Sequence, residues 1–300
     1  MADNAVPAPG TGIPPIVAAV DGSEISYQAV AWAAVEAELR GSPLHIITSY
    51  AIPTREDART ALGVAEVAAL RADGARVLAE ATRIAEHATP QRQVEITTEF
   101  TFDLIIPTLL ARSKQAAMIV VGNRGRGAVR RALLGSVSTA LSRHAHCPVT
   151  IVHGISQTDP VSATKPIVVG VDGTDNSMPA IEMAFEEAAR RKVALIAVHA
   201  WSDTTGYDLP VVGWDSIRET EQTLLAESLA GFGERYPEVT VERVVACDTA
   251  VRALLEQADS AQLLVVGSHG RSGFAGIALG SVSAAVLHHA VCPVLVVRER

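Results

Sequence analysis

The sequence predicts an α/β protein made of two tandem, doubly wound domains, each with a five-stranded parallel sheet. The first observation behind this prediction is a repeat, because residues 16–23, IVAAVDGS, recur as IVVGVDGT at 167–174. The second is that short apolar segments alternate with helix-forming segments within each copy, which favours right-handed crossovers and helices on both faces of a parallel sheet. The third is length, since 300 residues suit about two domains of roughly 150 residues each.

The repeat continues through the rest of the chain. Further matching pairs are PLHIITSYA at 43–51 with VALIAVHAW at 193–201, residues 120–138 with 265–283, and residues 144–152 with 288–297. A polar stretch rich in Pro, Ser and Thr separates the two copies, as expected of a linker. The predicted organisation is a flexible tail at 1–13, a first domain at 14–153, a linker at 154–166 and a second domain at 167–300.

The elements of the first copy follow from local patterns. Short apolar runs predict buried strands, and the first of them ends in Asp-Gly, a turn dipeptide. Segments rich in Ala, Glu and Arg, with apolar side chains at helical spacing, predict helices. In chain order we expect strand 16–20, helix 26–40, strand 44–50, helix 60–88, strand 94–100, helix 104–114, strand 118–122, helix 136–145 and strand 149–152.

Composition and charge exclude several classes of protein. The formal net charge of -8 argues against a general nucleic-acid binder, which would carry a basic face. No apolar run approaches the ~20 residues that span a bilayer, and the first residues lack a signal-peptide pattern. Three cysteines without a CxxC pair fit a reducing compartment. We therefore expect a cytoplasmic protein that binds neither nucleic acid nor membranes.

Histidines near two of the cysteines raise the question of a zinc site. They are His144 and His146 near Cys147, and His288 and His289 near Cys292. Because neither group has a further CxxC or HxxxH pair to complete four ligands, we expect no metal site there. Histidines at helix ends that interact with the last carbonyl groups explain both groups better.

A glycine-rich pattern after the fourth strand of each copy carries the functional signal. Gly122, two residues, Gly125, nine residues and Gly135-Ser136 recur at the same spacing as Gly267, Gly270 and Gly280-Ser281. Each pattern starts directly after an apolar strand, at the sheet edge where doubly wound sheets bind ligands. Glycine lets successive backbone N–H groups converge on a phosphate, and the following helix presents unpaired N–H groups and its positive dipole end. We predict one phosphate-binding loop in each copy.

A plain helix cap, a Walker A loop and a dinucleotide-binding turn fit this pattern less well. The serines could simply cap a helix, but the whole pattern occurs twice after an apolar strand. A Walker A loop needs Lys before its Ser or Thr, which neither copy has. The dinucleotide fingerprint GxGxxG belongs after the first strand, where the chain has only Asp21-Gly22 and Asp172-Gly173.

The spacing, with Asp-Gly after the first strand, resembles the ATP-binding branch of the universal stress protein family, and two fused copies resemble its tandem form. The resemblance covers residues 16–152 and 167–298 and implies a Rossmann-like fold of the adenine nucleotide alpha hydrolase type. It also implies that the loop and serines hold phosphates and ribose, while the aspartate lies near the nucleoside. The matching positions are Asp21, Gly22, Gly122, Gly125, Gly135, Ser136, Val137, Ser138, Asp172, Gly173, Gly267, Gly270, Gly280, Ser281, Val282 and Ser283. Family members usually have Thr at the last serine of each copy, which keeps the hydroxyl.

The two predicted sites differ in charge. The first loop contains Arg124, Arg126, Arg130 and Arg131, whereas the second contains His269 and Arg271. Arginines beside a phosphate add charge-assisted hydrogen bonds, so we add Arg126 and Arg271 to the predicted binding residues; a solvated basic loop is the alternative. Because a carboxylate repels a polyphosphate, we expect Asp21 and Asp172 to meet ribose, base or a bound Mg²⁺, with a plain turn as the alternative.

The doubled loop predicts one nucleotide site per domain, and we expect no catalytic residues, because no nucleophile and base can be recognised. The resemblance implies an ATP-binding regulator of stress response or growth arrest. A slow ATPase or nucleotidyl-transfer enzyme and a cyclic-AMP receptor on the same fold are the alternatives. The sequence does not identify a regulatory protein partner. The resemblance implies a homodimer, and the apolar strands 149–152 and 295–297 support it, because exposed edge strands are normally covered by pairing.

Overall fold

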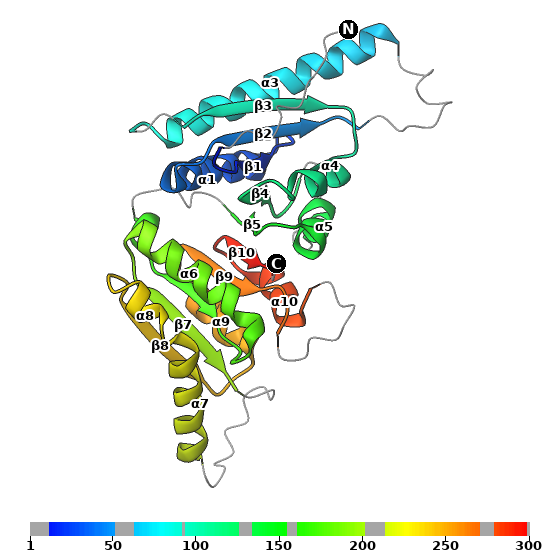
Figure 1. Ribbon diagram of the computed structural model, residues 1–300. Coiled ribbons are helices and arrows are strands. Elements are labelled where there is room, and N and C mark those ends of the chain that lie inside the picture. Colours follow the sequence, from blue (N-terminus) through cyan, green and yellow to red (C-terminus); the bar gives the residue numbers. More distant parts are fainter. Residues whose placement is uncertain are drawn as a thin grey trace.

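The structure is a computed structural model that describes residues 12–51, 63–91, 94–125, 134–154, 161–201, 214–270 and 279–298. Its two halves repeat the predicted alternation of strands and helices (Figure 1). The first half contains β1 (Ile16–Ala19), α1 (Glu24–Arg40), β2 (Leu44–Ser49), α3 (Val64–Ala88), β3 (Ile96–Thr101), α4 (Ile105–Arg112), β4 (Met118–Gly122), α5 (Ser136–His144) and β5 (Val149–Val152). The second half contains β6 (Ile167–Gly170), α6 (Met178–Arg191), β7 (Leu195–Ala200), α7 (Trp214–Leu229), α8 (Phe232–Arg235), β8 (Val241–Ala246), α9 (Ala250–Ala258), β9 (Leu263–Gly267), α10 (Ser281–His289) and β10 (Val294–Val297).

The described strands form one sheet in the order β3-β2-β1-β4-β5-β10-β9-β6-β7-β8. Within each half all neighbouring strands run parallel, and the chain order reverses between β1 and β4 and between β6 and β9. The prediction of two doubly wound, five-stranded parallel domains is confirmed. In register, Ile16 lies opposite Leu44 and Ile167 opposite Leu195. Leu44 therefore corresponds to Leu195, and our alignment of 43–51 with 193–201 is wrong by one residue.

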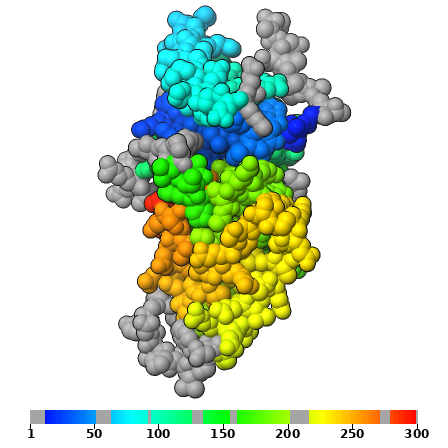
Figure 2. Space-filling view, turned by 90° about the vertical axis from the view of Figure 1, so that its left-hand side faces the viewer, coloured from blue at the N-terminus to red at the C-terminus, as the bar shows by residue number. Residues whose placement is uncertain are grey.

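The two halves join through their last strands. β5 and β10 pair antiparallel, with Ile151 opposite Val294, and Figure 2 shows the first half seated on the second. The backbone groups that we expected a second copy to cover are therefore covered within the chain, so this argument for a homodimer is wrong. Among the described strands, β3 and β8 lie at the edges of the sheet, and β8 carries exposed Glu242 and Arg243, charges that discourage further strand pairing.

Local sequence explains where the first helix begins and ends. Ser23 is the N-cap of α1 and its side chain accepts a hydrogen bond from the backbone N–H of Ser26. Gly41 ends the helix in the left-handed conformation, with φ 63°, where a residue without Cβ is favoured. The corresponding helix α6 ends on Lys192 in the same conformation, with φ 57°. The two halves therefore keep the same helix end although only one has glycine there.

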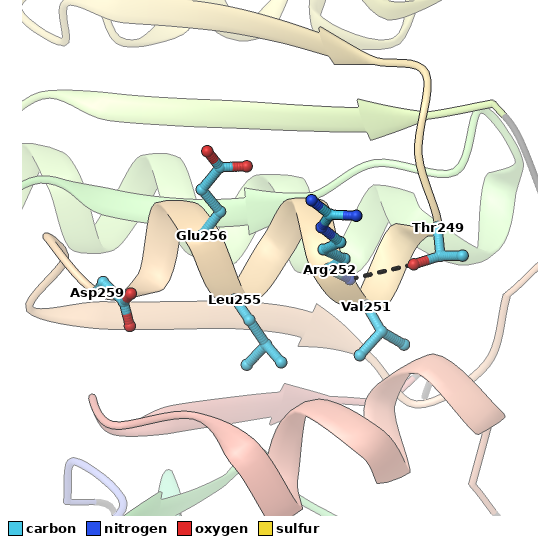
Figure 3. Close-up of a pocket in the computed structure, with 6 residues that line it drawn as sticks. All are labelled: Thr249, Val251, Arg252, Leu255, Glu256 and Asp259. Atoms are coloured by element: carbon cyan, nitrogen blue, oxygen red, sulfur yellow. Dashed lines mark hydrogen bonds between the residues drawn. The ribbon is translucent and has the colours of Figure 1, made fainter. Parts of the chain in front are cut away.

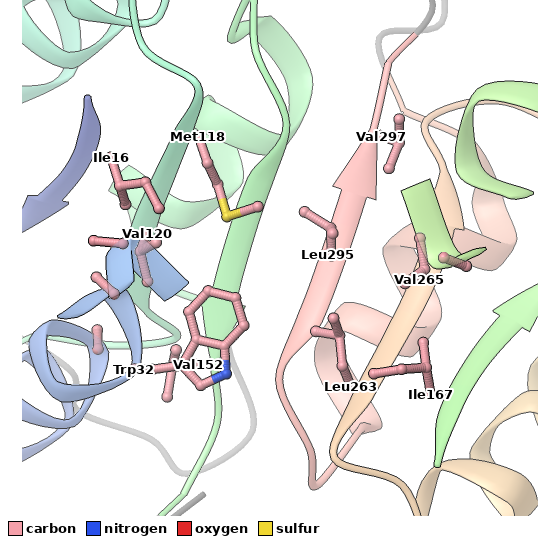
Figure 4. Close-up of a cluster of buried hydrophobic side chains, with 14 of the residues drawn as sticks. Ile16, Trp32, Met118, Val120, Val152, Ile167, Leu263, Val265, Leu295 and Val297 are labelled. Carbon is pink, nitrogen blue, oxygen red and sulfur yellow. The ribbon is translucent and has the colours of Figure 1, made fainter. Parts of the chain in front are cut away.

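Buried apolar side chains cover both faces of the sheet. One cluster joins Ile16, Trp32 and Met118 of the first half to Ile167 and Leu295 of the second (Figure 4). The core on this face is therefore continuous across the β5–β10 junction.

Four charged side chains, Glu36, Arg40, Glu187 and Arg191, form an ionic quartet where α1 meets α6. Each arginine pairs with both glutamates, and Arg191 Nε lies 3.1 Å from Glu187 Oε2. Both glutamates are fully buried. In the repeat, Glu36 corresponds to Glu187 and Arg40 to Arg191, so each half contributes the same pair and the quartet is balanced in charge.

The residue after each half's last strand contacts the last helix of the other half. His153 Nε2 donates to the carbonyl of Leu287 in α10 at 2.8 Å, and burial lowers the pKa of His153. At the corresponding position, Arg298 donates to the carbonyls of Ser142 and Arg143 in α5. A cationic or N–H donor at a helix carboxyl end is favourable. These contacts tie the two halves together on a second side of the junction.

Candidate functional site

A cavity of about 270 Å³ lies in the second half at the carboxyl ends of β6, β7 and β9. This is where the strand order reverses, the usual ligand position in a doubly wound sheet. Its volume is near the lower end of the range of small-molecule sites, about 300–1,000 Å³. One end of the cavity is apolar, and the other is formed by the glycine-rich loop and the start of α10.

The polar end contains the predicted loop residues of the second half. The lining residues here are His269, Gly270, Gly280, Ser281, Val282 and Ser283. The N-cap of α10 is Gly280, which has no capping side chain, and its N–H donates to the carbonyl of Ser268 at 2.7 Å. The first N–H groups of a helix have no partner within it, so this end of the cavity offers backbone donors to an anion.

The same geometry recurs at the start of α5 and shows whether the first serines cap the helices. Gly135 is the N-cap, without a side-chain hydrogen bond, and Ser136 is the first helical residue. The alternative in which the first serines merely cap the helices is therefore wrong. Ser136 and Ser281 are exposed, which leaves their hydroxyls accessible to a ligand.

Ser138 and Ser283, two residues after the first serines, have a different role. Ser283 Oγ donates to the carbonyl of Gly267 at 2.6 Å, and Ser138 Oγ donates to the carbonyl of Gly135 at 3.0 Å. Both serines are buried. Their hydroxyl protons bind the loop to the helix, so we expect these serines to shape the loop and Ser136 or Ser281 to donate to a ligand.

The aspartate after the first strand of each half is held by its own turn. Asp172 Oδ1 accepts from the N–H and the hydroxyl of Thr174, at 2.8 and 2.7 Å, and Asp21 Oδ1 makes the same bonds with Ser23. The intervening glycines have φ near 80°, at 81° for Gly22 and 78° for Gly173, which suits a residue without Cβ. Each aspartate therefore stabilises a turn, as the alternative proposed. Asp172 also lines the cavity, and its contact with a ligand stays a prediction.

The glycines of both loops lie against other backbone groups. A Cβ added to Gly280 would come 3.4 Å from Ser268 O, and one added to Gly135 would come 3.3 Å from Asn123 O. At Gly267 the nearest atoms would be carbonyl oxygens at 3.2 Å, and at Gly122 they belong to Ile25 of α1. Gly122 therefore lets the strand end pack closely on α1, and its role in binding a phosphate stays a prediction.

The apolar end of the cavity was not identified from the sequence. Its walls are Gly170, Val171, Val198, Ala200, Ala250, Leu254 and Val266. Behind them, the fully buried His199 lies 2.8 Å from Val171 O through Nδ1 and 2.7 Å from Glu221 Oε2 through Nε2. The one signal in the sequence was a histidine inside an otherwise apolar strand.

The predicted residues of the first half come together in the same way. Gly122 ends β4 and Gly125 lies in the loop after it, Ser136 and Val137 begin α5, and Asp21 lies beside Gly125. The predicted binding residues Arg126 and Arg271, like Arg130 and Arg131, lie outside the described residues.

Two further features of the described residues bear on function. Among them, no group of three or more His, Cys, Asp or Glu side chains is placed to hold a metal ion. Burial raises the pKa of Cys292 to about 12, which keeps its thiol protonated, whereas metals bind the thiolate. None of the described helices has both the length and the apolar character that a membrane span needs.

Comparison with known proteins agrees with this geometry. The family described as the universal stress protein family matches residues 12–153 and again 163–298. A universal stress protein of Mycobacterium tuberculosis is 42% identical over 290 residues, which cover 95% of this chain and 97% of the relative. A second one from that species is 39% identical over 285 residues, covering 95% and 96%.

A solved structure that matches nearly the whole chain shows the same fold. A universal stress protein from Archaeoglobus fulgidus has a TM-score of 0.67 and 20% identity, covering 95% of this chain and 98% of its own. A universal stress protein solved in complex with cAMP is 31% identical and covers 45% of this chain and 98% of its own, with a TM-score of 0.38. With two matches that together span nearly the whole sequence, this chain belongs to the universal stress protein family, in its tandem two-domain form.

Proposed function

We propose that this protein binds ATP and acts as a nucleotide-dependent regulator of a stress response or of growth arrest. The observation that supports this best is the cavity of the second half, which combines an apolar end with a glycine loop and a helix start. A nucleobase is a flat, largely apolar group and suits the first end, while phosphates suit the backbone donors of the second.

Asp172 supports a nucleotide lying between the two ends. Its Oδ1 is oriented by Thr174, and its Oδ2 lies on the side of Gly270, where an added Cβ would come within 3.3 Å of it. A fixed carboxylate accepts hydrogen bonds from ribose hydroxyls and repels phosphates. The position of Asp172 therefore favours a ligand with a ribose at the middle of the cavity.

Length of the loop favours ATP over cyclic AMP. Nine residues separate Gly270 from Gly280, and Ser281 at the helix start is exposed, so this end suits a chain of phosphates rather than one cyclic phosphate.

The role of a regulator rather than an enzyme rests on the titratable groups around the cavity. Among the described lining residues these are Asp172 and His269, and Ser268 Oγ lies 2.9 Å from His269 Nδ1. Both groups already serve the shape of the loops, so we expect ATP turnover far below the ~1–1000 per second of typical enzymes. A cytoplasmic location, no nucleic-acid or membrane partner, and a homodimer built through faces other than β5 and β10 belong to the same proposal.

The test is to purify the protein without added nucleotide, denature it and identify any released small molecule by mass spectrometry, then to titrate ATP and cyclic AMP by calorimetry. We expect ATP or ADP to be released and ATP to bind more tightly than cyclic AMP. Preference for cyclic AMP would overturn the ligand assignment, and no binding of either would overturn the proposal altogether. Phosphate release above about one per second would show an enzyme instead.

A further inference from the structure

The apolar end of the cavity in the second half is lined by unusually small side chains. Gly170 ends β6, and Ala250 begins α9, with Leu254 one turn later. Figure 3 shows the rest of this helix: Val251 and Leu255 point toward α10, while Glu256 points the other way. The residues that this helix presents to the cavity are others, Ala250 and Leu254, and Ala250 is the smaller of the two.

The first half has larger residues at three positions of this wall, whereas Leu109 corresponds to the identical Leu254. Both α4 and α9 begin at the corresponding position, so Ile105 stands where the second half has Ala250. By the register of the strands, Ala19 takes the place of Gly170, and Ile47 that of Val198. Isoleucine has three more carbons than alanine, and each of the other two changes adds one.

These larger side chains belong to the buried core on this face of the sheet or pack against it. Ile105 and Ala19 pack against the buried cluster that includes Ile47 and Leu109. The additional carbons therefore fill space at the end of the site where the second half has an open apolar wall.

The glycine loop of the first half also leaves less space beside its aspartate than the loop of the second half does. A Cβ added to Gly270 would come 3.3 Å from Asp172 Oδ2, which is tight but tolerable, whereas one added to Gly125 would overlap Asp21 Oδ2. The loop of the first half therefore lies closer to its aspartate, at the place where we expect ribose. The starts of α5 and α10, in contrast, have the same N-cap glycine and the same buried serine.

We propose that the two halves recognise different parts of a nucleotide, and that the residue at 105 or 250 decides which. The second half binds a complete purine nucleotide. The first half keeps the phosphate cradle but excludes the base, so it binds polyphosphate groups without selecting adenine. This inference rests on the proposed nucleotide binding and divides it between two unequal sites.

The test exchanges the deciding residue between the halves of the full chain. Ala250→Ile and Ile105→Ala are compared with the wild type by calorimetric titration of ATP and, separately, inorganic tripolyphosphate. One or more carbons in an apolar pocket change affinity by about 10–200-fold, so the wild type should show one ATP site at least about ten times tighter than the other. Ala250→Ile should weaken that tight site by at least about ten-fold, and Ile105→Ala should create a second tight ATP site. Tripolyphosphate binding should change less than about three-fold in either variant.

Controls separate this inference from a loss of folding and from the proposed function. Val251→Ile enlarges a side chain of the same helix that points toward α10 and is not among the residues that line the cavity, so it should leave ATP binding unchanged. Ile105→Val removes a single carbon and repeats the first-half experiment with less risk to the core; it should tighten ATP binding there in the same direction. Two equally tight ATP sites in the wild type, or exchanges without effect, would overturn the inference while leaving the proposed function intact. Absence of any ATP binding would overturn both.

Discussion

The junction between the two halves and the two ligand sites have kept their symmetry to different degrees. At the junction, both halves contribute the same Glu and Arg pair to the ionic quartet. At the sites, Ile105 of the first half occupies the position of Ala250 in the second, and Arg124 occupies the position of His269. The reason is physical: in the quartet each arginine pairs with a glutamate of the other half, so a change in one half directly affects a side chain of the other. The two sites do not share side chains and can change independently.

Burying the four charges of the quartet has a cost in hydration free energy. Burial of an ion pair removes hydration that only good geometry and further hydrogen bonds can replace. Here Arg191 lies 5.3 Å from the Trp32 ring and donates to Gln262 at 3.2 Å, while Arg40 donates to the sulfur of Met183. In the repeat Trp32 corresponds to Met183, so the partners around the arginines have diverged although the charges have not. Charge balance is therefore the property that both halves must maintain.

The largest effect should follow from breaking that balance. Glu36→Gln leaves two guanidinium groups with one carboxylate in a buried place and removes the carboxylate whose charged form the arginines stabilise, so we expect the free energy of unfolding to fall by about 3–5 kcal/mol. Urea denaturation followed by circular dichroism measures it. The matched control is Glu182→Gln, because Glu182 pairs with Arg235 on the surface and such pairs contribute at most about 1 kcal/mol. If the two variants were equally stable, the quartet would not hold the halves together as described.

The second-largest effect should come from acid, which should weaken the ionic quartet between α1 and α6. Burial alone would raise the pKa of Glu36, but the charges of Arg191 and Arg40 outweigh it and lower that pKa from 4.5 to about 2. Burial and the negative charge of Glu36 raise the pKa of Glu187, so Glu187 takes up the first proton of the quartet and Glu36 remains ionised longer.

A lowered pKa in the folded state means that the contribution of Glu36 is complete above pH 4.5 and is lost as the pH falls toward 2. The difference corresponds to about 3 kcal/mol. Unfolding free energies measured from about pH 5 to about pH 2.5 should therefore fall more steeply in the wild type than in Glu36→Gln. Glu182→Gln should follow the wild type. Parallel curves for the wild type and Glu36→Gln would contradict the assignment of this pKa.

Much of the architecture could be predicted from the sequence because it depends on local patterns. Strands such as 118–122 and helices such as 26–40 are specified by apolar runs and helix formers, and the repeat doubles every observation. The β5–β10 pairing could not be predicted in this way. An apolar edge strand demands a partner, but neither 149–152 nor 295–297 says whether that partner is another chain or the other half.

The residues of the candidate site could likewise be predicted only in part. Glycines and serines that shape the loop could be identified because their spacing is a property of one continuous segment. The wall residues Gly170, Ala250 and Leu254 come from two separate elements, and only the strand register and the helix face bring them to one cavity. The roles of Ser136 and Ser138 also needed the structure, because the sequence does not tell which hydroxyl a loop carbonyl has already engaged.

The smallest predicted effect comes from the different charges at the phosphate-binding ends of the two sites. Measuring it would show whether the sites differ in charge as well as in their apolar walls. Arg124 lies directly before Gly125, where the second half has His269 before Gly270. A guanidinium beside a phosphate adds a charge-assisted hydrogen bond, but a half-exposed charge is screened as the Debye length falls from ~10 Å at 0.1 M salt to ~3 Å at 1 M. Backbone N–H groups at the start of α10 carry only partial charges and should be less affected.

We therefore expect tripolyphosphate binding to the first half to weaken more with salt than binding to the second. Arg124→Gln should weaken binding to the first half by about two- to five-fold at low salt, which corresponds to the 0.5–1 kcal/mol scale of exposed ion pairs, and should reduce its salt dependence. His269→Gln is the matched control and should leave the salt dependence of the second half nearly unchanged. Calorimetric titrations at about 0.1 M and about 1 M salt compare the two variants. An equal salt response at both sites would mean that backbone donors, rather than the arginine-rich loop, dominate phosphate binding in each half, and that the sites differ only at their apolar ends.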